Sequence, residues 1–140
     1  MIASYKSNYF LDSNIWIYAL ANNQDVRKHD IACQLVDAEG VVISTQVVNE
    51  VCLNLLKKSS FTEQQVRELI ESFYEGCRIV TFNQEVFISA SEVRARYNFS
   101  FWDSLIIACA LSAEASILSS EDMHDGLVIN SQLEIRNPFK

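Results

Sequence analysis

The sequence predicts an α/β fold with a mainly parallel sheet covered by helices on both faces. Short apolar segments alternate with amphipathic segments of helical period along the chain, a pattern typical of strand–helix–strand units. Gly40 and Gly76 each separate a helix-like from a strand-like segment, and Gly126 precedes another apolar segment; glycine commonly follows the last turn of a helix. With 140 residues, 49% of them apolar and 21% charged, the chain suits a single domain, which we predict over residues 1–140.

The first half of the chain contains two expected strands and three expected helices. The apolar segment "YFLD" predicts a strand at 9–12, and a helix is expected from Ser13 to about Ala21. The segment "DIACQLVDAE" is helical in pattern and precedes a strand in "VVIS". A helix over 45–58 follows, with an expected apolar stripe of Val48, Val51, Cys52 and Leu55.

In the second half, Thr62 and Gln65 have the spacing of a capping box, which predicts the start of a further helix. "CRIVTF" predicts a strand, 83–97 a helix, and 102–114 a mostly apolar, buried helix. Short strands are expected in "SIL" and "LVI". The tail "QLEIRNPFK" predicts an edge strand that stops near Pro138.

Charge, hydropathy and cysteine content exclude several classes of protein. The net charge of −7 argues against broad electrostatic wrapping of nucleic acid, which requires a basic surface. The longest apolar run, 105–111, is too short to span a membrane. The four cysteines have apolar neighbours and no zinc-site spacing, so we expect buried, reduced thiols in a cytoplasmic protein.

Acidic residues follow the expected strands, where ligands bind in open α/β sheets. Asp12 closes the first strand, Glu50 lies in the helix after the second, and Asp103 opens the apolar helix. A group of three acids, Glu121, Asp122 and Asp125, follows "SILSS". These residues are far apart in sequence, but the predicted topology can bring them to one edge of the sheet.

Each acid also has a purely structural interpretation. In this interpretation, Asp12 is simply the N-cap of the helix that starts at Ser13 and has no further role. Asp103, three residues after Ser100, resembles the second member of a capping box. Asp122 and Asp125 are typical turn residues. Glu50 has no capping role; its structural interpretation is a solvent-exposed side chain on the helix surface beside Val47 and Leu53.

Taken together, the acids indicate a metal site. Four carboxylates in one crevice repel one another and raise each other's pKa values. A divalent cation removes that penalty, and oxygen ligands suit Mg²⁺ or Mn²⁺, which also bind substrate phosphate. Such an ion activates water and stabilises charge on a phosphoryl centre. The chemistry that this pattern indicates is phosphodiester hydrolysis.

Four segments, "FLDSNIWIY", "STQVVNEV", "FSFWDSLIIACA" and "ILSSEDMHDG", resemble the successive motifs of PIN-domain ribonucleases, and most of all the toxins of VapBC-type toxin–antitoxin pairs. The resemblance implies an α/β/α sandwich and a Mg²⁺- or Mn²⁺-dependent endoribonuclease. Its motifs match the acids Asp12, Glu50, Asp103 and Asp122.

The resemblance also implies roles for these residues. Asp12 and Asp103 are the expected direct metal ligands, Glu50 a ligand or a group that orients the attacking water, and Asp122 a ligand of a second metal or a group acting through water. The expected supporting residues are Asn14, Ser120 and Glu121. Glu121 or Asp125 remains open as the fourth acid.

The same resemblance implies an RNA substrate. It also implies that the protein forms a homodimer and binds an antitoxin protein, both over the apolar surface of 45–58 and 62–75. One alternative is a PIN fold that lost catalysis and serves as a binding module. Another is a haloacid-dehalogenase-type phosphatase, but that family uses D-x-D and Asn14 occupies the second position. A phospho-receiver domain lacks a second acid beside Asp12.

Three aromatic residues, Phe99, Phe101 and Trp102, adjoin Asp103. They can stack on nucleobases. Because the apolar segment "LIIACAL" follows them, we expect core packing for at least two of the three.

Overall fold

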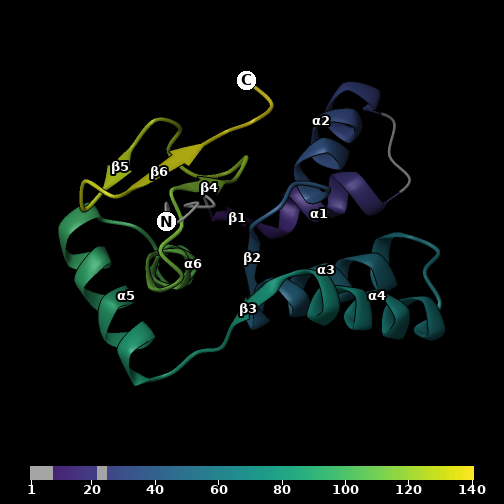
Figure 1. Cartoon of the computed structure of the whole chain (residues 1–140), viewed down its shortest axis with the longest axis horizontal. Helices are drawn as coiled ribbons and strands as arrows, with labels where there is room; N and C mark the ends of the chain where they lie inside the picture. Colours follow the sequence, from purple (N-terminus) through teal and green to yellow (C-terminus); the bar gives the residue numbers. More distant parts are fainter. Residues whose placement is uncertain (1–7, 22–24) are drawn as a thin grey trace, which may run out of the picture.

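The computed structural model describes residues 8–21 and 25–140, and the other residues of the predicted domain lie outside this description. Within it, helices and strands alternate along most of the chain (Figure 1). The strands are β1 (Tyr9–Leu11), β2 (Val41–Ser44), β3 (Arg78–Val80), β4 (Ile117–Ser119), β5 (Val128–Ile129) and β6 (Leu133–Arg136). The helices are α1 (Ser13–Leu20), α2 (Val26–Val36), α3 (Thr45–Lys58), α4 (Glu63–Gly76), α5 (Gln84–Tyr97) and α6 (Phe101–Ser112).

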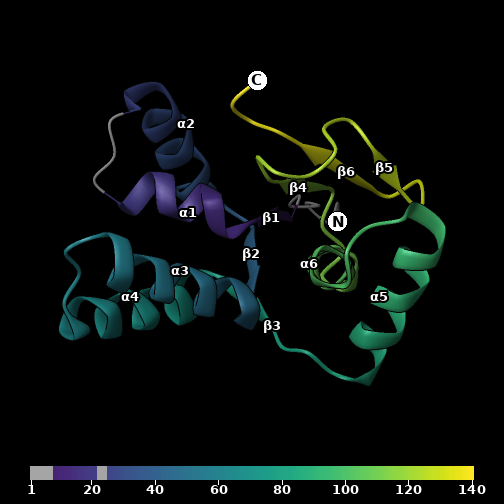
Figure 2. The same cartoon turned by 180° about the vertical axis from the view of Figure 1, so that it is seen from behind.

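The strands form one sheet in the order β3-β2-β1-β4-β6-β5. All neighbours are parallel except β5, which is antiparallel to β6. Helices α5 and α6 lie on one side of the sheet and α1 to α4 on the other, as Figures 1 and 2 show from opposite directions. The prediction of a mainly parallel sheet between two helical layers is therefore confirmed.

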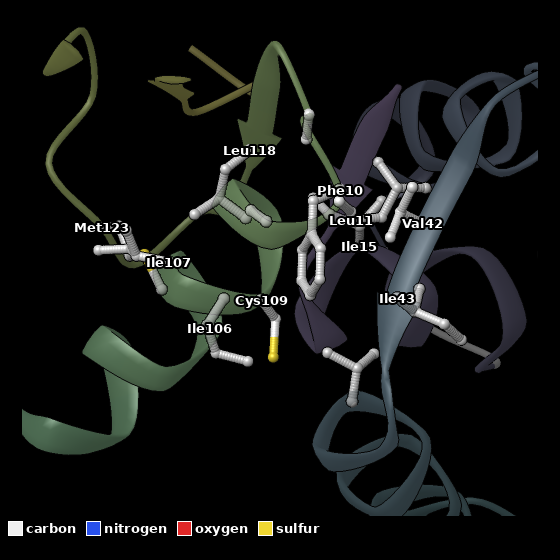
Figure 3. Close-up of a cluster of buried hydrophobic side chains, with 14 of the residues drawn as sticks. Phe10, Leu11, Ile15, Val42, Ile43, Ile106, Ile107, Cys109, Leu118 and Met123 are labelled. Carbon is white, nitrogen blue, oxygen red and sulfur yellow. The ribbon is translucent and has the colours of Figure 1, made fainter. Parts of the chain in front are cut away.

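The core lies between the sheet and α6 on one side and between the sheet and the helices α1 and α3 on the other. Strand β2 is buried along its whole length, and α6 is buried from Ser104 to Ala110. Figure 3 shows the Phe10 ring of β1 beside Cys109 of α6. Both side chains are fully buried. Strand β1 and helix α6 therefore both contribute side chains to this part of the core.

Capping residues set the start of the helices that surround the carboxyl edge of the sheet. Asp12, Ser44 and Ser100 cap α1, α3 and α6 with their side chains. The predicted capping box at the start of α4 is present, since Thr62 and Gln65 exchange both hydrogen bonds. Each cap satisfies a backbone N–H that the first turn of a helix leaves without a partner.

Two details of the expected fold are wrong. The tail strand is β6, which lies between β4 and β5 instead of at an edge of the sheet, because the short β5 pairs with its outer side. Gly76 is the last residue of α4 and does not follow it; the extended residue Cys77 ends this helix. Gly40 does adopt a left-handed conformation, with φ of 81°, just before β2, where a side chain would be disfavoured.

The buried stripe of α3 differs from the expected one by a small rotation. Val47, Val51 and Leu55 are fully buried, whereas Val48 and Cys52 are only half-buried. Glu50 therefore borders the buried stripe instead of standing on a solvated face.

The four cysteines are unpaired thiols, as expected, but only Cys109 is buried. Burial raises the pKa of its thiol to about 12. The other three are half-buried. In the described part of the chain, no helix combines the length and apolar character that crossing a membrane requires.

Removal of the Phe73 ring is expected to lower the free energy of unfolding by about 3–5 kcal/mol, the usual cost of Phe→Ala in a core. Phe73 is 1% exposed and packs edge-to-face on Trp16 of α1, with ring centroids 4.9 Å apart. Urea denaturation of Phe73→Ala measures the change. The control is Ile88→Ala, because Ile88 is 52% exposed on α5; its effect should stay within about 0.5 kcal/mol. Equal effects would contradict the described packing of α4 on α1.

Candidate functional site

The site lies where the strand order changes direction. Within the sheet, β2 and then β3 lie on one side of β1, whereas β4 is the neighbour on the other side of β1. Such a switch point leaves a crevice beyond the carboxyl ends of the two central strands, which is where open α/β sheets bind ligands. The residues that follow these strands are Asp12 after β1 and Ser120 after β4.

Asp12 and Ser120 are bonded directly across this crevice. The Ser120 hydroxyl group donates to Asp12 Oδ2 at 2.8 Å, and the Asp12 backbone N–H donates to the Ser119 carbonyl at 3.0 Å. The Ser13 backbone N–H donates to Asp12 Oδ1 at 2.8 Å. Asp12 is therefore a helix cap, and its carboxyl group also faces the crevice, so the two interpretations of this residue hold together.

Burial raises the pKa of Asp12. The hydrogen bonds from Ser120 and Ser13 lower it, and the charges of Asp103 and Asp122 raise it again. Because a carboxyl group that is 8% exposed loses most of its hydration, its charged form requires compensation from its neighbours.

Asn14 and Ser120 hold Asp122 at the same crevice. Asn14 Nδ2 donates to Asp122 Oδ2 at 3.2 Å. The Asp122 backbone N–H donates to Ser120 Oγ at 3.3 Å, and the Glu121 backbone N–H donates to Asn14 Oδ1 at 3.4 Å. The first turn of α1 and the loop after β4 are thus joined by hydrogen bonds in both directions.

The side chains of the other two acids of this loop contact residues outside the crevice. Glu121 forms an ion pair with Lys28 and accepts a hydrogen bond of 2.9 Å from the Tyr18 hydroxyl group. Asp125 accepts a hydrogen bond of 2.8 Å from the Asn137 backbone N–H. Of the three acids that the sequence left open, Asp122 is the one whose side chain reaches Asn14 and the crevice.

Glu50 approaches from α3 and has an incompletely satisfied carboxyl group. Trp102 Nε1 donates to Glu50 Oε2 at 3.4 Å. Glu50 Oε1 is buried and has no hydrogen-bond partner among the described residues. Burial raises the pKa of Glu50, as does the charge of Asp12, while the Trp102 hydrogen bond lowers it. Gln46 lowers the pKa as well, although its amide atoms complete no hydrogen bond of standard geometry within the described residues.

Asp103 lies in the first turn of α6. Its backbone N–H donates to the Ser100 hydroxyl group at 3.0 Å, so Ser100 is the cap and the Asp103 carboxyl group remains available to the crevice. Burial raises the pKa of Asp103; the Ser100 hydroxyl group lowers it and the charge of Asp122 raises it. The first turn of a helix favours a negative charge, but here burial outweighs that effect.

The electrostatic effects connect all four predicted acids. Asp12 is influenced by Asp103 and Asp122, Glu50 by Asp12 and Asp103, and Asp103 by Asp122. The acids come from four different elements: the end of β1, α3, α6 and the loop after β4. Each of these interactions raises a pKa, which is the signature of carboxylates that repel one another.

The chemistry of this donor set fits a hard divalent cation. Its members are carboxylate oxygens, and the buried Glu50 Oε1 lacks a partner. A cation would compensate the mutual repulsion. Within residues 8–21 and 25–140, no group of three or more Asp, Glu, His or Cys side chains is arranged so that it could hold a metal ion. Mg²⁺ commonly keeps several waters and takes only one or two carboxylates from the protein, so the donor set needs no such arrangement.

A cavity of about 630 Å³ lies elsewhere, between α2, the sheet and the C-terminal residues. Its lining includes Tyr9, Leu35 and Pro138 but none of the four acids. A smaller hollow of about 350 Å³ does adjoin the site, because Asn14 and Glu121 line it together with Lys58.

Four residues around the site make contacts that were not anticipated. Gln46 precedes Glu50 by one helical turn, and this spacing of four was visible in the sequence. Lys28 and Tyr18, which hold the Glu121 side chain, carry no sequence signal that links them to residue 121. Trp102 is one of three aromatic residues of which at least two were expected in the core; its indole is exposed beside Glu50.

Neutralising Asp103 is expected to leave the metal-free protein as stable as the wild type or more stable at pH 7. The native pKa of Asp103 lies above its ordinary value of 3.8, so between the two values the native state holds more protons than the unfolded state. The wild type therefore loses stability as the pH rises through this range. Asp103→Asn removes this loss, and its advantage should vanish below pH 3.8, where the carboxyl group is protonated in both states.

Denaturation in EDTA between pH 3 and 7 measures this difference. Melting with Mn²⁺ extends the test, because Mn²⁺ should stabilise the wild type and not Asp103→Asn. Glu85→Gln is the matched control, since Glu85 also lies in the first turn of a helix but outside the crevice. It should slightly destabilise the protein at pH 7. An Asp103→Asn variant that behaves like this control would identify Asp103 as a helix-terminal charge only.

Comparison with known proteins agrees with this fold. The chain resembles a toxin–antitoxin complex component from Klebsiella pneumoniae, with 19% identity, a TM-score of 0.70, and coverage of 94% of this chain and 98% of that one. It also resembles VapC20 of Mycobacterium tuberculosis, described as a Sarcin-Ricin loop cleaving toxin, with 22% identity, a TM-score of 0.62, and coverage of 79% and 87%.

A third structure, VapBC2 from Rickettsia felis bound to a DNA fragment from its promoter, is 21% identical with a TM-score of 0.61, and the match covers 92% of this chain and 98% of that one. No protein with a curated description matches the chain in sequence. The family model described as PIN domain matches residues 9–125. This match contains all four acids of the crevice, and the chain belongs to the PIN domain family.

Proposed function

We propose that this protein is a Mg²⁺- or Mn²⁺-dependent endoribonuclease and the toxin of a toxin–antitoxin pair. The observation that carries the proposal is the position of Asp12 and Asp122 at the switch point of the sheet, where Ser120 and Asn14 hold their carboxyl groups. Glu50 and Asp103 approach from α3 and α6, and each acid influences or is influenced by another. Membership of the PIN domain family and the similarity to toxin structures support it.

In this proposal, Asp12 and Asp103 bind the cation directly, because both are placed by helix N-termini at the crevice. Glu50 either binds it through its unpaired Oε1 or orients the attacking water. Asp122 holds a second ion or acts through a water molecule.

The supporting residues act on the carboxylates instead of the substrate. Ser120 donates to Asp12, and Asn14 donates to Asp122, so both carboxyl groups are oriented before an ion arrives. Glu121 supports the same loop through its backbone bond to Asn14. The ion, when bound, lowers the pKa of a water molecule and stabilises charge on the phosphoryl group.

We further propose that the protein forms a homodimer and binds an antitoxin through the apolar surface of α3 and α4, and that it acts in the cytoplasm. Leu53, Leu56 and Tyr74 on these helices are 48%, 37% and 57% exposed. The net charge of −7 suits a partner that presents arginine to the carboxylates. The free thiols support a reducing compartment.

Light scattering of the purified protein, alone and with the product of an adjacent gene, tests these partners. We expect the mass of a dimer for the protein alone and a larger complex with the adjacent product. Leu53→Asp together with Tyr74→Asp should weaken one or both assemblies. A monomer that binds no neighbouring product would contradict the proposal.

The alternative is a PIN fold that binds without catalysis. The observation in its favour is the lack of a complete set of metal ligands among the described residues. Against it, the motif positions carry acids throughout. The phosphatase alternative loses its basis, since the chain belongs to a different family.

Incubation of total cellular RNA with the protein and Mn²⁺ tests catalysis. We expect discrete new 5′ ends with the wild type and none with Asp12→Asn or Asp103→Asn, because each variant removes a proposed ligand. Asp125→Asn is the matched control: it makes the same change in the same loop as Asp122, but its side chain contacts the C-terminal residues. This variant should cleave like the wild type. Identical RNA ends from the wild type and Asp103→Asn would favour the binding module.

A further inference from the structure

Two large aromatic side chains are exposed in the first turn of α6, next to Asp103 in the sequence. Phe101 is 44% exposed and Trp102 is 53% exposed, while α6 is buried from Ser104 to Ala110. The expectation that at least two of the three aromatic residues before this helix pack in the core is thus wrong, because only Phe99 packs against it. Exposure of a tryptophan leaves a large apolar surface in contact with water.

Trp102 is placed by the site itself. Its Nε1–H donates to Glu50 Oε2 at 3.4 Å, and its neighbour in sequence is Asp103. The hydrogen bond directs the N–H edge of the indole towards the carboxylates and leaves about half of the side chain open to solvent. The ring is therefore adjacent to the position where a scissile phosphate would bind in the proposed function.

The charge of the protein limits how it can hold RNA. With a net charge of −7, the protein cannot rely on a broad basic surface for affinity. Stacking of a nucleobase on an aromatic ring requires no positive charge and stabilises binding of single-stranded nucleic acid. A tryptophan with an open surface beside the reacting phosphate supplies this interaction where it is most useful.

We propose that Trp102 is a stacking platform for the nucleobase next to the scissile phosphate. This inference rests on the proposed nuclease function. It assigns a binding role to a side chain that also orients Glu50 through its N–H. The role requires the aromatic ring, whereas the orientation of Glu50 requires the N–H, and substitutions can separate the two.

The two tryptophans of the chain make the contact measurable. Trp16 is 6% exposed and packed on Phe73, so a neutral quencher such as acrylamide reaches Trp102 far more readily. Adenosine 5′-monophosphate with Mg²⁺ is a suitable probe, because it carries a base and a phosphate but no phosphodiester bond. We expect it to reduce acrylamide quenching at least about twofold, and ribose 5-phosphate to leave quenching unchanged. In Trp102→Phe, the remaining emission from Trp16 should respond to neither compound.

Cleavage kinetics with a single-stranded RNA identified by the 5′-end experiment complete the test. Trp102→Ala should raise KM about 5- to 150-fold, the effect of losing one base–aromatic stack. Any fall in kcat from the lost N–H bond to Glu50 should be shared by Trp102→Phe, which also lacks the N–H. Trp102→Phe and Trp102→Tyr keep a ring and should recover most of the affinity. Phe87→Ala is the control, because Phe87 is also 44% exposed but lies on α5; its KM should equal that of the wild type.

Several outcomes would overturn the inference. If the KM of Trp102→Phe rises as much as that of Trp102→Ala, the N–H bond to Glu50 matters for binding and stacking does not. If acrylamide fails to reach Trp102 in the free protein, a second copy or another protein covers it. Cleavage by the wild type without nucleotide protection of Trp102 would reject the stacking role alone. Protection of Trp102 without any cleavage would instead reject the nuclease function and retain the base-binding site.

Discussion

The hydrogen bond between Ser120 and Asp12 is the interaction on which the geometry of the site depends. It joins the ends of β1 and β4, which are 108 residues apart in sequence and become neighbours only through parallel pairing. Around this bond, the first turn of α1 and the loop after β4 exchange further contacts through Asn14. The sheet determines where the crevice lies, and these bonds determine which carboxylates enter it.

The same crevice imposes an electrostatic cost on the fold. Helix N-termini at Asp12 and Asp103 favour negative charge, yet burial and mutual repulsion raise the pKa values of both residues and of Glu50. The helices thus reduce the repulsion without cancelling it. A site with this imbalance is suited to a ligand of opposite charge, which explains why stability and ion binding are linked in the proposed function.

Local sequence patterns predict the elements of this protein well, because caps and periodicity act over a few residues. The helix over 45–58 begins and ends as expected, and the expected capping box at Thr62 is present. The position of β6 inside the sheet was missed, since strand order depends on pairing between distant segments. The four candidate acids were predicted from their places after strands and from the family resemblance. The contacts that direct Glu121 and Asp125 away from Asn14 involve Lys28 and Asn137, which no local pattern connects to them.

The ion pair between Lys28 and Glu121 has an evolutionary consequence. Glu121 adjoins Asp122, and its charge is directed away from the crevice by a lysine on α2 and the hydroxyl group of Tyr18. A neutral residue at 28 would leave an unmatched negative charge beside a crowded group of acids. Among descendants of this sequence, substitutions at 28 and 121 should therefore be accepted as pairs: a lineage that loses the lysine first will tend to lose the glutamate next.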